Sequence, residues 1–137
     1  MLSAINYSLN SVLHALVAED IIEPTFTTPF VKYDKTRNAL TIKGSSTRKN
    51  IVQFYDRVLG DFKYNLRTKR RGELHLNFTK FGPSTLKILF SLLRFVSKEQ
   101  QLGTKVDVVW SVAGAEVEML DTIRDFAELY DLRLKIR

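Results

Sequence analysis

The stretch Leu74–Val96 constrains the fold most, because it joins the patterns of a strand, a tight turn and a helix. Residues 74–81 alternate between apolar and polar side chains, as a half-buried strand does. Gly82-Pro83 interrupts the alternation, and proline is favoured at the first position of a helix. Residues 86–96 are strongly apolar and predict a central helix. We therefore expect a strand–turn–helix unit at the centre of the fold.

The chain before this unit predicts a hairpin and two further helices. Phe30–Asp34 and Ala39–Gly44 resemble strands around a polar turn, which is typical of a β-hairpin. Ser45-Ser46-Thr47 offers N-cap residues for a helix whose apolar positions recur at helical spacing over residues 51–62. Upstream, Tyr7–Ile22 carries apolar residues three and four apart and predicts a short amphipathic helix. This helix could pack on the domain, dock a partner or mediate oligomerisation.

The chain after the central unit completes an alternation of strands and helices. Lys105–Val112 is rich in β-branched residues and predicts a strand buried on both faces. A last helix is expected from Gly114, and Leu132–Ile136 alternates as a final strand does. The order is β-β-α-β-α-β-α-β, which predicts a single α/β domain over residues 28–137 with a mixed sheet flanked by helices. Residues 1–27 would form an N-terminal helical extension.

Charge and composition leave one alternative open. The net charge of +6 favours anionic partners, and the densest cations are Arg67, Lys69, Arg70 and Arg71. This run supports an alternative hypothesis of a basic anion- or nucleic-acid-binding module. Nucleic-acid binding commonly uses aromatic side chains beside the cations, on which the bases stack. Tyr64 is the only aromatic residue near this run, so the sequence disfavours nucleic acid as a partner. The absence of cysteine fits a reducing cytoplasm, and no apolar run is long enough to predict a membrane span.

Residues with catalytic potential are few. His14 and His75 are the only histidines, and their spacing links neither to a second metal ligand. Dinucleotide-binding, P-loop and nucleophile-elbow motifs are absent. The acidic residues of the last helix have the spacing of a solvated face. The sequence therefore predicts no enzyme, no metal site and no cofactor.

Two hydroxyl residues, Ser84 and Thr85, fall in the opening turn of the central helix. A phosphate there would be stabilised by free backbone N–H groups and the helix dipole, and it would add nearly two negative charges. Both residues are therefore candidate phosphoacceptors. Taken alone, the pattern favours the simpler role of satisfying donors in the first helical turn.

A series of short motifs from residue 28 to the C-terminus matches one family in order and spacing. They are Thr28-Pro29-Phe30, Leu40–Gly44, Asn50, Phe54-Tyr55, Phe81, Ser84, Lys87, Val108–Trp110, Met119 and Asp125-Phe126. Together they resemble the SiaC family of bacterial regulatory phosphoproteins. The resemblance implies a fold similar to STAS and anti-sigma-factor-antagonist domains, and a signalling regulator without catalytic activity. It also implies a Ser/Thr kinase and a phosphatase as partners, and a diguanylate cyclase that the unphosphorylated form activates to promote biofilm formation.

The chain departs from the family pattern at the turn itself. The family typically has Tyr-Phe-Asn-Thr-Ser-Ser with the threonine as phosphoacceptor, whereas Lys80–Thr85 places Pro83 at that position. Proline cannot be phosphorylated, so either Ser84 or Thr85 has replaced it, or the chain binds its partner constitutively. The family's Pro-Glu-Asn before the first helix is also changed, to Arg48-Lys49-Asn50. The resemblance places partner binding at Phe81, Gly82, Pro83, Ser84 and Lys87.

Overall fold

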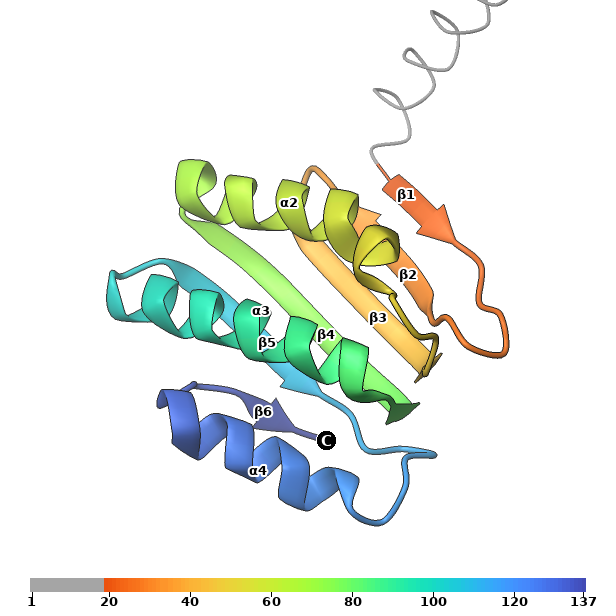
Figure 1. The fold of residues 1–137 in the computed structure, drawn as a ribbon. Helices are drawn as coiled ribbons and strands as arrows, with labels where there is room; N and C mark the ends of the chain where they lie inside the picture. Colours follow the sequence, from red (N-terminus) through yellow and green to blue (C-terminus); the bar gives the residue numbers. More distant parts are fainter. Residues whose placement is uncertain (1–18) are drawn as a thin grey trace, which may run out of the picture.

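A computed structural model describes residues 19–137, and within this range the chain forms a six-stranded mixed sheet and three helices (Figure 1). The strands are β1 (Glu19–Ile22), β2 (Phe30–Asp34), β3 (Ala39–Ser46), β4 (Arg71–Phe81), β5 (Lys105–Trp110) and β6 (Lys135–Ile136). The helices are α2 (Val52–Lys69), α3 (Pro83–Gln101) and α4 (Met119–Tyr130). No helix in this range is long and apolar enough to cross a membrane.

The strands lie side by side in chain order. β1, β2 and β3 pair antiparallel, whereas β3, β4, β5 and β6 pair parallel through the crossover helices α2, α3 and α4. Right-handed crossovers that all step in one direction place their helices on one face of the sheet. Figure 1 shows the three helices following one another across the sheet. The domain therefore has two layers, and the other face of the sheet is not covered by these helices.

The core fills the space between the sheet and the three helices. Alternate residues of the strands point toward the helices and are buried, as the half-buried strand pattern predicts. The main contributors are Leu40 and Ile42 of β3, Leu74, Leu76 and Phe78 of β4, and Val106, Val108 and Trp110 of β5, packed against Phe62, Leu66, Leu89, Leu92, Leu93, Ile123 and Phe126 of the helices. The expected α/β domain with an initial hairpin and parallel crossovers is confirmed.

Two predictions about the strands are wrong. β5 is not buried on both faces, because Asp107 is exposed and Val109 only half-buried on the face that the helices leave open. Residues Glu19–Ile22 do not end a helix but form β1, which pairs with β2 and places Ile22 opposite Val31. Pairing with a free sheet edge outweighs the helical spacing of the apolar residues here. The remainder of the predicted helix, residues 7–18, lies outside the described residues.

Two predicted helix starts are also wrong. α2 begins at Val52 without a side-chain cap, because Ser46 belongs to β3 and is buried. α4 begins at Met119 rather than at Gly114, so Val117 lies in the preceding loop with 92% of its surface exposed. The acidic side chains of α4 are exposed, as predicted.

Candidate functional site

The turn between β4 and α3 has the geometry that its sequence predicts. Gly82 is the extended N-cap residue of α3, and its N–H donates to the carbonyl of Ser46 at 3.0 Å. Pro83 is the first helical residue and is exposed. Gly82 does not need a left-handed backbone, since its φ is −95°. A Cβ added there would meet the backbone of Thr47 at 3.5 Å, an ordinary contact, so the turn could hold a larger residue.

Thr85 points into the protein and belongs to a buried chain of hydroxyl groups. Its Oγ1 donates to the carbonyl of Ser46 at 2.9 Å and lies 2.7 Å from the Ser46 Oγ, which lies 2.6 Å from the Tyr55 hydroxyl. The single Thr85 proton goes to the carbonyl, so Ser46 donates to Thr85 and Tyr55 donates to Ser46. Burial raises the pKa of Tyr55 to about 12, so this donor stays protonated. The chain ties α2 and β3 to the first turn of α3.

Ser84 lies beside this chain but faces the surface. Its Oγ accepts a hydrogen bond from the backbone N–H of Asn50 at 3.3 Å, which holds the loop before α2 against the turn. Arg48 and Lys49 in that loop are exposed, and so is Lys87 on α3. The two hydroxyls that the sequence pairs therefore differ in access: Thr85 is 1% exposed, whereas Ser84 is only partly buried among residues that include exposed cations.

The other two side chains of the turn differ in burial. Phe81 is anchored to the core, whereas Pro83 is exposed. Phe81 packs edge-on against the buried ring of Phe78, with 5.4 Å between ring centroids. Pro83 projects from the end of the helix without burial. The turn thus presents Pro83, Ser84 and Lys87 on a rigid base.

The cations of the predicted anion-binding run are exposed, and three of them also contact groups within the protein. Arg67 and Arg70 approach the carboxylate of Glu99, which is 4% exposed, at 3.8 Å each. The Arg70 guanidinium also donates to the carbonyl of Leu102 at 2.6 Å. The ammonium group of Lys69 donates to the carbonyl of Lys35 at 3.1 Å. The run is therefore not a solvated loop: it ends α2 and clamps that helix to α3.

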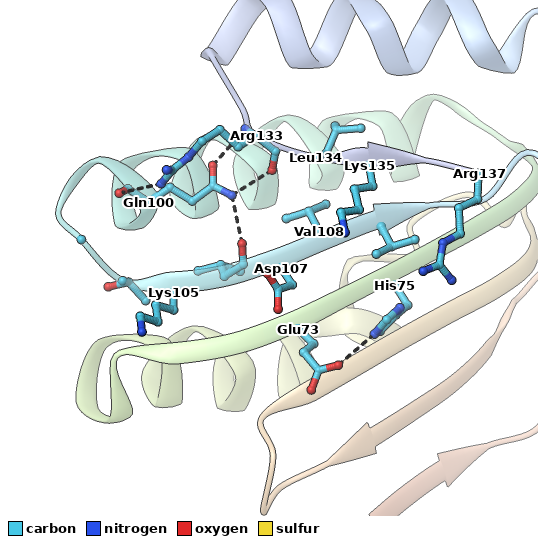
Figure 2. A pocket seen from close by; sticks show the side chains of 14 residues that line it. Glu73, His75, Gln100, Lys105, Asp107, Val108, Arg133, Leu134, Lys135 and Arg137 are labelled. Atoms are coloured by element: carbon cyan, nitrogen blue, oxygen red, sulfur yellow. Dashed lines mark hydrogen bonds and ion pairs between the residues drawn. The ribbon is translucent and has the colours of Figure 1, made fainter.

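Arg71, the last cation of the run, begins β4 on the open face of the sheet. On this face a shallow hollow of about 790 Å³ lies over β4, β5 and the last strand (Figure 2). Figure 2 shows His75, Asp107, Lys135 and Arg137 projecting from this side. The sequence prediction missed the hollow because it expected β5 to be covered on both faces.

The hollow is lined by acidic and basic side chains, and its Glu73 carboxylate is already paired within the protein. The Glu73 carboxylate accepts two hydrogen bonds from Arg37, at 2.9 and 3.0 Å, and lies 3.3 Å from His75 Nε2. Burial alone would raise the pKa of Glu73, but the hydrogen bonds and charges of Arg37 and His75 lower it. In the described part of the chain no group of three or more His, Cys, Asp or Glu side chains could hold a metal ion. The hollow therefore has the features of a solvated sheet face.

The fold and the turn define a class: a small two-layer α/β domain whose most distinctive surface is a rigid turn at a helix N-terminus. A family model described as SiaC family regulatory phosphoprotein matches residues 22–137. The chain therefore belongs to the SiaC family of regulatory phosphoproteins.

Solved structures agree with this assignment at the level of the fold. The crystal structure of apo-SiaC from Pseudomonas aeruginosa is similar at a TM-score of 0.77 and 20% identity, covering 87% of this chain and 98% of that chain. SiaC in the crystal structure of the diguanylate cyclase SiaD with its activator SiaC, from the same organism, gives a TM-score of 0.75 at 21% identity, covering 85% and 97%. A comparison with curated proteins found no match.

Proposed function

We propose that this chain is a non-catalytic regulator that binds and activates a diguanylate cyclase, with the turn and first helical residues at Phe81–Lys87 as its main recognition surface. Membership of a family of regulatory phosphoproteins supports a regulatory role. The similar fold of SiaC, which is the activator of SiaD, supports the kind of partner. The single observation that carries the site is that the exposed Pro83 and the half-buried Ser84 lie on a turn fixed by buried hydrogen bonds.

Regulation by phosphorylation, with a Ser/Thr kinase and a phosphatase as further partners, would act through Ser84. Pro83 has no hydroxyl, and Thr85 already uses its hydroxyl in the buried chain. Ser84 accepts only a long hydrogen bond from Asn50 and lies on the surface side of α3. A phosphate there would gain the N–H groups of the helix end and add about two negative charges beside Arg48 and Lys49. This change reshapes the surface that the cyclase would meet. We place this signalling in the cytoplasm.

The alternative of a basic binding module has less support. Arg67 and Arg70 hold Glu99, and Lys69 is bonded to a backbone carbonyl. The Glu99 carboxylate offsets part of the positive charge of Arg67 and Arg70, which weakens the attraction of these two side chains for a phosphate.

The test measures binding to the diguanylate cyclases of the organism that encodes this chain. Wild type and Ser84→Ala are expected to bind equally, and Ser84→Asp to bind at least tenfold more weakly. Thr36→Asp is the control, because Thr36 is exposed in the turn between β2 and β3, away from α3 and α4. Absence of binding by wild type would refute the partner. Equal binding by all variants would remove Ser84 from the mechanism and leave partner binding intact.

A further inference from the structure

An apolar groove of about 490 Å³ runs between α3 and α4. Leu86 and Phe90 line it from α3, and Phe126 and Leu129 line it from α4. Phe90 is 39% exposed and Leu129 62% exposed, so both present apolar surface to water. Leu86 and Ser84 lie two residues apart on α3, which turns them about 200° from each other. The groove therefore opens away from the proposed phosphorylation site, and Lys87, three residues from both Ser84 and Phe90, lies between the two surfaces.

The floor of the groove is fixed by aromatic packing. The rings of Phe90 and Phe126 meet edge to face with centroids 5.1 Å apart. Phe126 in turn stacks on Trp110, which is fully buried in β5, at 5.9 Å. A surface anchored to the core in this way is formed before any ligand arrives, which lowers the entropic cost of binding.

The two ridges of the groove carry opposite charges. On α4, Asp125 and Glu128 line the groove and are exposed. On α3, Lys87 and Arg94 are exposed and lie three and four residues from Phe90, which places them beside it on the helix surface. An occupant therefore meets an apolar floor, an acidic ridge on one side and a basic ridge on the other.

We propose that this groove binds an amphipathic helix of a protein partner, with cations along the flank that faces α4 and carboxylates along the flank that faces α3. This inference rests on the proposed function and names the element that the partner presents. Apolar anchors at i, i+3 or i+4 and i+7 match two helical turns lying along the groove. Because the ridges differ in charge, a given helix fits in only one direction, so the groove selects orientation as well as composition.

Two other occupants fit less well. Residues 1–18 of this chain contain apolar residues at helical spacing but no Lys, Arg, Asp or Glu, so they match the floor and neither ridge. A second copy would bring one concave groove against another, and their ridges would meet while both floors stayed unfilled. Of these three occupants, a convex, charged helix satisfies floor and ridges together.

The test uses a fluorescent synthetic helix of about 14 residues, roughly 20 Å long, with a leucine stripe, lysines on one flank and glutamates on the other. A second peptide has the lysines and glutamates exchanged. Fluorescence anisotropy should show the matched peptide binding at least tenfold more tightly than the exchanged one. This preference should fall as salt screens the ridges. Glu128→Lys should reduce it, because that change reverses one charge of the acidic ridge.

The apolar floor is tested by Leu129→Gln, which removes an anchor without changing either ridge. We expect about tenfold weaker binding of the matched peptide. Leu102→Gln is the control, because Leu102 is similarly exposed, at 66%, but lies at the far end of α3. Equal affinity for both peptides, or equal effects of the two leucine changes, would overturn the inference. So would a wild-type dimer that Leu129→Gln converts to a monomer, because the occupant would then be a second copy.

The same variants separate this inference from the proposed function. If the cyclase binds and Leu129→Gln leaves its affinity unchanged, the groove inference fails and the proposed function stands. If the cyclase does not bind wild type, the proposed function fails, and the peptide measurements still decide what the groove accepts.

Discussion

At the residue scale, two neighbouring hydroxyls have different structural roles because a helix turns about 100° per residue. Thr85 lies one turn before the buried Leu89, so it faces the core and needs partners there. Ser46 and Tyr55 supply them from β3 and α2. Ser84 is rotated away and meets only the loop at Asn50. The sequence alone could not separate the two residues, because the partners of Thr85 are distant in the chain.

The buried hydroxyl chain predicts a loss of stability in Tyr55→Phe. The change removes the donor to Ser46 while keeping the ring, so we expect a loss of about 1 kcal/mol in the free energy of unfolding. Urea denaturation measures it. Tyr64→Phe is the control, because Tyr64 is 68% exposed. If both variants lost the same stability, the hydrogen bond to Ser46 would contribute nothing specific.

The lowered pKa of Glu73 predicts a pH dependence. A carboxyl whose pKa is lower in the folded state stabilises the fold above its unfolded value of 4.5, and the stabilisation is lost as the pH falls through the folded value. Glu73→Gln should therefore flatten the fall in stability below about pH 4.5. Unfolding followed at a series of pH values from neutral to acidic tests this. Asp107→Asn is the control, because it removes a carboxylate from the same sheet face. In this variant the free energy of unfolding should fall more steeply at acidic pH than in Glu73→Gln.

At the scale of elements, the junction of α2 and β4 shows how a charged run can be structural. Arg70 adopts a left-handed backbone with φ of 60° at the end of α2, and its side chain reaches Glu99 and the end of α3. A run of cations looks like a solvated loop when only neighbours in sequence are considered. The buried acidic partner lies about thirty residues away, so no local pattern could reveal it.

The contacts of Arg70 with Glu99 and Leu102 predict that replacing Arg70 or its neighbour Arg71 by alanine lowers the free energy of unfolding by different amounts. Arg70→Ala leaves the buried Glu99 with one fewer cation and should lower the free energy of unfolding by about 1–3 kcal/mol. Arg71→Ala, at the exposed start of β4, should change it by less than about 0.5 kcal/mol. Thermal or urea unfolding compares the two. Retention on a heparin column that falls equally for both variants would instead favour the basic-module alternative.

The turn itself predicts that the family's typical acceptor can be restored. Gly82→Asn with Pro83→Thr should fold normally, since the backbone at Gly82 suits any residue and Pro83 is exposed. Loss of the proline should cost about 0.4–1 kcal/mol through the unfolded state. The proposed Ser/Thr kinase should then modify the introduced threonine, and mass spectrometry of the peptide detects this modification. If Ser84 alone were modified in both proteins, the kinase would recognise Ser84 and no longer residue 83, even when residue 83 is a threonine.

At the scale of the whole molecule, the order of strands and helices was predictable, but the placement of the layers was predicted only in part. Periodicity within Leu74–Phe81 identified a strand with one buried face, and that strand is central. Periodicity did not show that all three crossovers use the same face, which is why Val109 was expected to be covered. The hollow over β5 and the groove between α3 and α4 arise from the same arrangement. Neither corresponds to a sequence motif.

The edge strand β1 gives the last prediction, which compares two truncations. Removal of residues 1–18 leaves β1 in place. Removal of residues 1–23 also deletes β1, and with it the ion pair of Asp20 with Arg57 at 3.6 Å. The edge of β2 that pairs with β1 is then uncovered. An uncovered edge strand offers free N–H and carbonyl groups to other chains. The longer truncation should therefore self-associate and unfold at a lower temperature, while the shorter one should behave as the full chain. Light scattering after size-exclusion chromatography and thermal unfolding measure this. A change in mass already on removing residues 1–18 would instead support the hypothesis of an N-terminal oligomerisation segment.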